Sequence, residues 1–324
     1  MKRILLTREM ALLTGLVLLL VGFSIYTPGF FDLFNLLDRS RYWVITGLIA
    51  VPMTFVIATS GIDLSVGSIV ALSSMVLGLS FHNLGWPIGV ASFAAIATGL
   101  LAGGLNGVII SKLRIPPLVV TLATMAFYSG LAYGISKAKP ITGFPPSFQW
   151  ISQGDAFEFN IGGGPVFFPV SLLFLIAIYI GGTLLLRKSW FGRYTEAIGE
   201  NETAAEFAAI NVRKMKLAIY TFSGLIAGIA ALFYSAQFAS ARPDAGKGLE
   251  LEAVACVVVG GTRISGGRGS IPGTLLGLLI IGILRYGLEM SGVKSEHLII
   301  VIGVLLIIMA VFNEWMATRS GGRQ

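Results

Sequence analysis

Long runs of apolar residues recur along the whole chain, and they constrain its fold more than any other feature. A helix needs about 20 residues to cross the hydrocarbon core of a bilayer, where every backbone N–H and C=O group must be paired within the protein. The runs therefore predict an all-α polytopic membrane protein with about ten transmembrane helices. The expected spans are residues 10–27, 43–60, 66–82, 86–111, 117–136, 167–187, 217–238, 251–262, 271–288 and 297–313.

Composition agrees with a single transmembrane domain over residues 1–324. Charged residues make up 12% of the chain, whereas they make up about a quarter of a typical soluble domain. The loops between the runs are short, so we expect no separate soluble catalytic domain. The run at 251–262 is short for a span, and the sequence leaves open whether it crosses the bilayer fully.

The basic residues predict the orientation of the chain in the lipid bilayer. With the N-terminus inside, the inner segments hold 15 of the 23 lysines and arginines, and cytoplasmic loops are enriched in these residues. All five tryptophans fall at or near span ends or in loops, as the membrane–water interface favours. Both termini are therefore expected in the cytoplasm.

The longest outer loop, 137–166, is rich in proline and glycine, which argues against a regular element there. Its length suits a lid or a docking surface. The longest inner loop, 188–216, is polar and alanine-rich, so we predict that it is helical. We expect Gly199 to break it into two pieces and Thr203 and Glu206 to form a capping box at the second. This loop either fits a groove on another protein or only caps the bundle.

A polar break, "TSGIDLSVGS" at 59–68, interrupts the apolar sequence after the second span. Such a break is tolerated at membrane depth only where protein buries it or water reaches it. Asp63 has two interpretations. It caps the third span, since Asp is a favoured N-cap, or it contacts a polar solute together with Ser60 and Ser65, since intramembrane carboxylates mark solute paths.

A second glycine-rich break, "VVGGTRISGGRGSIPG" at 258–273, resembles the first in miniature. Such similarity is either a trace of an internal repeat, as transporters often carry, or chance. Gln237 and Glu252 stand near the outer ends of the neighbouring spans. They are candidates for the solute path, and the alternative is that they are solvated groups at the rim.

Several classes of function are excluded by what the sequence lacks. It contains no G-x-x-x-x-G-K-[ST] motif, so the chain has no phosphate-binding loop of its own. No His, Cys, Asp and Glu residues have metal-ligand spacing, and no Ser–His–acid set is placed for catalysis. We therefore expect no catalytic residues, no metal and no cofactor. The net charge of +7 reports membrane topology rather than nucleic-acid binding.

Three long segments carry a resemblance to a known family. They are "GIDLSVGS", "GRYTEAIGENETAAEFAAINVRKMKLAIYTFSGLIAG" and "ASARPDAGKGLELEAVACVVVGGTRISGGRGSIPGTLLG". In this order they resemble the permeases of bacterial ABC sugar importers of the ribose permease family, over roughly residues 43–313. The resemblance implies an ABC importer permease fold in the bacterial inner membrane, with 137–166 in the periplasm and 188–216 as the cytoplasmic coupling loop.

The resemblance also implies partners. These are ABC ATPase subunits, a second permease copy or a paralogue, and a periplasmic binding protein that delivers the solute. The solute would be a monosaccharide such as ribose or a deoxyhexose, or the sugar-like autoinducer-2. Within the coupling loop the residues expected at the ATPase are Glu196, Glu200, Asn201, Glu202, Ala204, Ala205, Ala208 and Ala209. The alternative function is a secondary active transporter for a small polar solute, for which Asp63 is the one plausible ion-coupling carboxylate.

The expected topology can be tested with reporters fused after Gln324. A reporter that works only in the cytoplasm is expected to be active, and one that works only in the periplasm is expected to be silent, because the basic residues favour inner termini. Activity of the periplasmic reporter would show that the number of spans is odd, and the short run at 251–262 would be the first to remove from the count.

Overall fold

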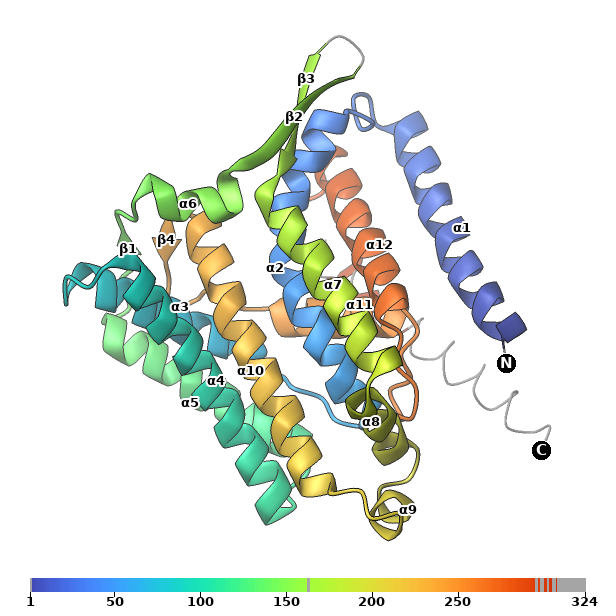
Figure 1. The fold of residues 1–324 in the computed structure, drawn as a ribbon. Helices are drawn as coiled ribbons and strands as arrows, with labels where there is room; N and C mark the ends of the chain where they lie inside the picture. Colours follow the sequence, from blue (N-terminus) through green and yellow to red (C-terminus); the bar gives the residue numbers. More distant parts are fainter. Residues whose placement is uncertain are drawn as a thin grey trace.

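The computed structural model describes residues 2–161, 164–294, 297, 300, 301, 303, 304 and 307, and it is predominantly helical (Figure 1). The helices are α1 Lys2–Tyr26, α2 Leu33–Ala58, α3 Val66–His82, α4 Ile88–Leu113, α5 Pro117–Ser136, α6 Pro146–Gln153, α7 Val170–Lys188, α8 Trp190–Glu200, α9 Glu202–Phe207, α10 Val212–Gln237, α11 Leu249–Val259 and α12 Ile271–Met290. The strands are β1 Ile141–Thr142, β2 Asp155–Ile161, β3 Gly164–Pro169 and β4 Ser240–Ala241.

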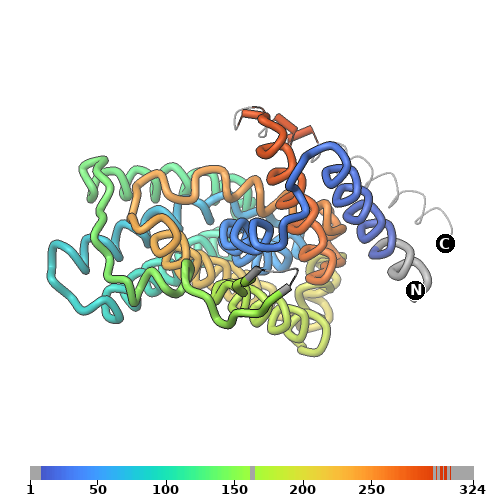
Figure 2. The backbone as a smooth tube through the Cα atoms, turned by 90° about the horizontal axis from the view of Figure 1, so that it is seen from above, coloured from blue at the N-terminus to red at the C-terminus, as the bar shows by residue number. Residues whose placement is uncertain are grey.

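Helix α2 is the centre of the bundle. It begins at Asp32, whose carboxylate accepts hydrogen bonds from the N–H groups of Phe34 and Asn35, and from Val44 to Ala58 every residue is buried. It packs against α7, α10, α11 and α12, and the view from above shows α3–α5 on one side of it and α1 with α12 on the other (Figure 2). A helix that is apolar all round is stable only when it is enclosed in this way.

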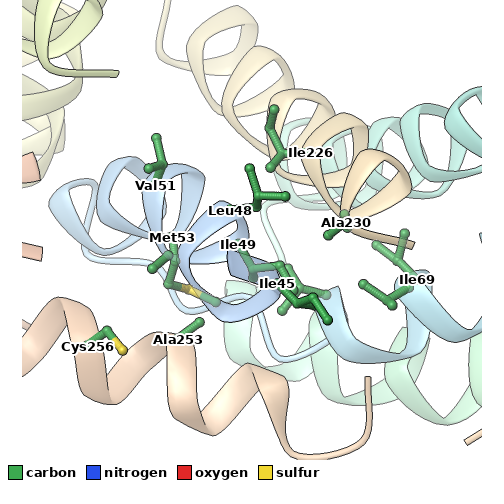
Figure 3. Packing of buried hydrophobic residues seen from close by; sticks show 14 of the residues in the cluster. Ile45, Leu48, Ile49, Val51, Met53, Ile69, Ile226, Ala230, Ala253 and Cys256 are labelled. Atoms are coloured by element: carbon green, nitrogen blue, oxygen red, sulfur yellow. The ribbon is translucent and has the colours of Figure 1, made fainter. Parts of the chain in front are cut away.

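Side chains from three other helices fill the space around α2 (Figure 3). Ile226 of α10 and Ile69 of α3 lie on one side of it, and Met53 of α2 points toward Ala253 and Cys256 of α11 on the other. All five are buried. The short helix α11 is therefore packed in the core against α2. The region that we expected as a short span, 251–262, lies in the interior of the protein.

Seven of the described helices are long and apolar enough to cross a membrane: those at 9–26, 33–58, 88–113, 117–136, 170–188, 212–237 and 271–290. The expected multi-pass helical architecture is thus confirmed, with helix ends shifted by a few residues and α2 beginning ten residues before the predicted 43. Helix α3 has 17 residues and α11 has 11. The count of ten spans is not confirmed, and most of the tenth, 297–313, lies outside the described residues.

The prediction that 137–166 holds no regular element is wrong. Strand β1 pairs antiparallel with β4, helix α6 follows, and β2 pairs antiparallel with β3 to form a hairpin. We call the end of the molecule that carries α6 and this hairpin the hairpin face, and the opposite end the α8–α9 face (Figure 1). Proline does not oppose this structure, because it stands where it is tolerated: at the start of α6 and within β3, which is an edge strand of a two-stranded sheet.

Helices α4 and α10 touch backbone to backbone along a row of glycines. A Cβ at Gly99 or Gly103 would collide with the backbone of α10, and a Cβ at Gly224 would collide with that of α4. The spacing of four residues on each helix places these glycines on one face. Small residues at this spacing let membrane helices approach closely, and their backbones then gain contacts that larger side chains would prevent.

This contact predicts opposite outcomes for two neighbouring glycines. Gly103→Ala is expected to lower the stability of the purified protein by about 1–3 kcal/mol, because the added methyl overpacks the contact. Gly104→Ala is the matched control, since its Cβ would meet only the Thr221 hydroxyl at 3.6 Å. It is expected to leave the melting temperature unchanged or to raise it slightly, because Ala is the better helix former. Equal melting temperatures for the two variants would contradict the proposed packing.

Candidate functional site

The polar break after α2 leads from the α8–α9 face into the core. Ser60 is exposed and has a positive φ of 61°. Its hydroxyl donates to the carbonyl oxygen of Ser265 at 2.7 Å and to that of Gly199 at 3.3 Å. Ser60 therefore does not face the interior in this structure. It joins the end of α2 to the second glycine-rich break and to α8.

The same three segments share further contacts, and we call them together the junction: residues 58–60, 196–200 and 263–269. The N–H of Gly267 donates to the carbonyl of Ala58 at 3.0 Å, and the N–H of Gly269 donates to Glu196 Oε1 at 3.2 Å. A Cβ at Gly199 would collide with the carbonyl of Ala58. Glycine is needed here because the three backbones approach one another directly.

Asp63 is completely buried. Its Oδ1 accepts from the N–H of Ser65 at 3.0 Å and from the Ser65 hydroxyl at 2.6 Å, and its Oδ2 accepts from the Ser223 hydroxyl of α10 at 2.9 Å. The N-cap of α3 is Ser65, with no side-chain capping bond. The interpretation of Asp63 as the cap of the third span is therefore wrong in position: Asp63 lies two residues before the N-cap, where its carboxyl organises the preceding turn and ties it to α10.

Ser65 extends this polar cluster to two more helices. Its hydroxyl accepts from Asn106 Nδ2 of α4 at 2.8 Å, and the Tyr128 hydroxyl of α5 donates to Asn106 Oδ1 at 3.1 Å. Buried polar groups of this kind are costly unless they are all paired. The cluster of Asp63, Ser65, Asn106, Tyr128 and Ser223 thus fixes how α3, α4, α5 and α10 meet.

The other two solute-path candidates lie apart from this cluster. Gln237, at the end of α10, accepts from the Ser152 hydroxyl at 2.9 Å and anchors α6. Glu252, in the first turn of α11, accepts from Arg285 Nη1 of α12 at 2.6 Å and from the Thr46 hydroxyl of α2 at 3.0 Å. Of the five candidates, only Asp63 and Ser65 are in contact with each other, and Glu252 lines a pocket near the hairpin face.

On the α8–α9 face the inner loop is helical, as predicted, but its details differ. The break falls at Asn201 rather than Gly199, and Asn201 itself caps α9 by accepting from the N–H of Ala204 at 2.9 Å. The capping box of Thr203 and Glu206 is therefore wrong, because Thr203 lies inside the helix. Asn is as good an N-cap as Ser or Thr, so either position fits the sequence.

The expected coupling residues divide into inward and outward groups. Glu196 and Glu200 lie at the junction, and a Cβ at Gly267 would collide with the Glu200 carboxylate. Glu202 forms an ion pair with Lys216 Nζ at 2.7 Å. Ala205 is 4% exposed and faces the protein's own interior, contrary to the expected alanine face. The residues of the set that are exposed are Glu200, Asn201, Glu202, Ala204, Ala208 and Ala209.

The aromatic residues on this face were not predicted from the sequence as functional candidates. Phe207, at the end of α9, is 88% exposed, and Trp190 and Tyr194 of α8 are also exposed and lie 5.7 Å apart between ring centroids. The sequence does contain a signal for Phe207, because an apolar ring in a polar loop between two spans has no lipid to contact. Exposed aromatic side chains of this kind are enriched at protein interfaces. Among the described residues, no group of three His, Cys, Asp or Glu side chains could hold a metal ion.

Comparison with known proteins gives consistent similarities. A family model described as "Branched-chain amino acid transport system / permease component" matches residues 35–310. The ribose import permease protein RbsC of Bacillus subtilis is 39% identical over 305 residues, which cover 93% of this chain and 91% of that protein. The fructose import permease protein FrcC of Rhizobium meliloti is 33% identical over 307 residues, 93% of this chain and 84% of FrcC.

The autoinducer 2 import system permease protein LsrD of Escherichia coli (strain SMS-3-5 / SECEC) is 33% identical over 328 residues, 96% of each chain. No solved structure matches.

The Asp63 cluster predicts different results for two substitutions. Asp63→Asn is expected to retain most stability, because one oxygen still accepts from Ser65 while the amide pairs with the rotatable Ser223 hydroxyl. Asp63→Ala leaves three buried donors unpaired, each at about 1–3 kcal/mol, and is expected to unfold or fail to insert. Thermal unfolding of the purified variants measures both. A stable Asp63→Ala, or an Asp63→Asn as unstable as the alanine variant, would contradict the structural role.

Proposed function

The chain belongs to the permease family of branched-chain amino acid and related transport systems and is the permease of an ABC sugar importer of the ribose type, and from this premise we propose the partners, the orientation and the solute with which it works. The partners are ATPase subunits bound to the α8–α9 face, a second permease copy or a paralogue, and a solute-binding protein at the hairpin face. The membrane is the bacterial inner membrane, with both termini in the cytoplasm.

The exposed surface of α8 and α9 is the observation that supports an ATPase partner. The sequence has no phosphate-binding loop, so a separate subunit must hydrolyse the ATP. This face carries three large aromatic residues that are exposed: Phe207, Trp190 and Tyr194. Aromatic residues that project from a helical surface are the residue types that dominate binding energy in interfaces.

The junction supports a route for mechanical coupling. Helix α8 contacts the end of α2 through the Gly199 carbonyl, and it contacts the loop before α12 through Glu196. A displacement of α8 by an ATPase would therefore act on two broken segments at once. Glu196 and Glu200 serve this coupling inside the permease. The exposed residues in and beside α9 serve it at the ATPase: Asn201, Glu202, Ala204, Ala208 and Ala209.

The orientation rests on charge and on the position of the partners. The α8–α9 face carries Arg114, Arg187, Lys188, Arg213 and Lys214, and basic residues of this kind mark cytoplasmic loops. The hairpin face then lies outside the cell, where β2 and β3 extend past the ends of the helices while β3 also packs against α2 (Figure 1).

The solute that we propose is a monosaccharide such as ribose. The names of the similar permeases give ribose, fructose and autoinducer 2 as their solutes, all small and rich in hydroxyl groups. The matches to import permeases for ribose, fructose and autoinducer 2 support this interpretation over the alternative, a secondary active transporter.

Substitution of Phe207 tests the ATPase surface. Phe207→Ala is expected to weaken binding of the partner ATPase at least about thirtyfold, since removal of an aromatic hot spot costs 2 kcal/mol or more. Co-purification and titration of the ATPase onto the reconstituted permease measure the loss, and ATP-dependent uptake should fall with it. Phe31→Ala is the matched control, because Phe31 is 64% exposed in the turn between α1 and α2 at the other end of the molecule. Equal ATPase affinity for the two variants would refute the assignment.

A further inference from the structure

A pocket of about 380 Å³ lies in the hairpin-side half of the protein, between α2, α10, α11, α12 and the loop 244–247. This volume is within the range of small-molecule sites, about 300–1,000 Å³. The pocket is distinct from the junction and from the Asp63 cluster, and none of the contacts proposed for the ATPase reaches it.

One wall of the pocket is a chain of ion pairs. Arg285 of α12 donates through Nη1 to Glu252 Oε1 at 2.6 Å and through Nε to Glu289 Oε1 at 3.1 Å. The second oxygen of Glu252 accepts from the Thr46 hydroxyl at 3.0 Å. Glu252 is the more enclosed partner, with 23% of its side chain exposed against 43% for Arg285. A carboxylate and a guanidinium are thus held at fixed positions beside an open volume.

The facing walls are aromatic. The rings of Tyr234 and Phe238 lie 4.6 Å apart between centroids, and Tyr42 meets Phe238 edge to face at 5.8 Å. Trp43 also lines the pocket, and its indole packs on Gly282 of α12, where a Cβ would lie 2.6 Å from the ring. The glycine thereby fixes the position of the tryptophan. Apolar walls with a few fixed polar groups are the usual construction of a small-molecule site.

We propose that this pocket is the solute site of the permease, and that it binds a neutral, polyhydroxylated ring with Glu252 and Arg285 as the residues that recognise its hydroxyl groups. The proposal rests on the proposed function and names the residues that carry it. A sugar hydroxyl both donates and accepts, so it can bond a carboxylate and a guanidinium that stand side by side. The carbon-bound hydrogens of the ring then lie against the aromatic walls.

The balance of charge favours a neutral solute. Arg39, Lys247 and Arg285 line the pocket together with Asp244, Glu252 and Glu289, three cations and three anions. Arg285 is already paired with two carboxylates, and Asp244 is paired with Arg242 at 2.9 Å. A cationic solute would therefore have to displace one of these ion pairs, which reduces affinity. An anionic solute would have Arg39 and Lys247 to pair with among the lining cations, whereas a neutral solute leaves the Glu252–Arg285 pair in place.

Trp43 provides a direct measurement of binding. The full chain in lipid nanodiscs, without nucleotide or partner proteins, is titrated with D-ribose and D-fructose while tryptophan fluorescence is recorded. A saturable change is expected, and it should be absent in Trp43→Phe although Trp86, Trp150, Trp190 and Trp315 remain. Glu252→Gln is expected to weaken sugar binding at least about tenfold, because a hydrogen bond to a charged group is lost, with the melting temperature close to that of the unsubstituted protein.

Glu289→Gln is the matched control. It removes the outer ion pair of Arg285 and leaves the Glu252–Arg285 pair intact, so sugar affinity should change less than threefold. Thr46→Val gives a second test that does not alter charge, and it should weaken binding through the loss of the hydroxyl that orients Glu252. Wild-type affinity in Glu252→Gln, or equal loss in Glu289→Gln, would overturn the assignment of these residues.

Two further outcomes would overturn the site or its class of ligand. The absence of any Trp43-dependent signal with both sugars would refute a solute site in this pocket. It would leave the ATPase assignment untouched, since Phe207 is tested by a separate measurement. Tighter binding of ribose 5-phosphate than of ribose would refute the neutral class and identify Arg39 and Lys247 as an anion site.

Discussion

Backbone polar groups that lipid or protein shields from water must be paired within the protein, and the architecture of this protein depends on how its two helix breaks meet this requirement. The breaks at 59–65 and 260–270 satisfy part of this need with each other, since the N–H of Gly267 bonds the carbonyl of Ala58 and the Ser60 hydroxyl bonds that of Ser265. Asp63 and Glu196 supply further acceptors for backbone N–H groups. Two irregular segments that would be unstable separately thus become one ordered junction against α8.

Much of the helical bundle could be predicted from the sequence, because an apolar run of sufficient length has few alternatives in a bilayer. The hairpin could not be predicted as easily. The alternating phenylalanines of "DAFEFNI" and the run "GPVFFP" carry a strand signal, but proline and glycine around them suggested a loop. The prediction of the α9 cap was wrong for another reason: Asn201 and Thr203 are both suitable caps, and only tertiary contacts select between them.

Of the candidate sites, the residues could be found but their partners could not. Asp63 and Glu252 attract notice because a carboxylate in apolar sequence is costly. Their partners on other helices, Ser223, Thr46 and Arg285, are distant along the chain. No periodicity within one helix indicates which residues of another will face it. The same separation explains why the five candidates fall at four separate places in the structure: Ser60 at the junction, Asp63 and Ser65 in the buried cluster, Gln237 beside α6 and Glu252 at the pocket.

The glycine contact between α4 and α10 has a mechanical consequence. Because the two backbones touch with no side chains between them, neither helix can rotate about its axis without bringing a larger residue into the contact. The two helices therefore move as one rigid unit. Helix α10 begins five residues after α9 ends. A displacement of α9 is therefore transmitted through this short connection to the rigid α4–α10 pair, which extends to the hairpin face. A single helix would bend and would transmit less of the displacement.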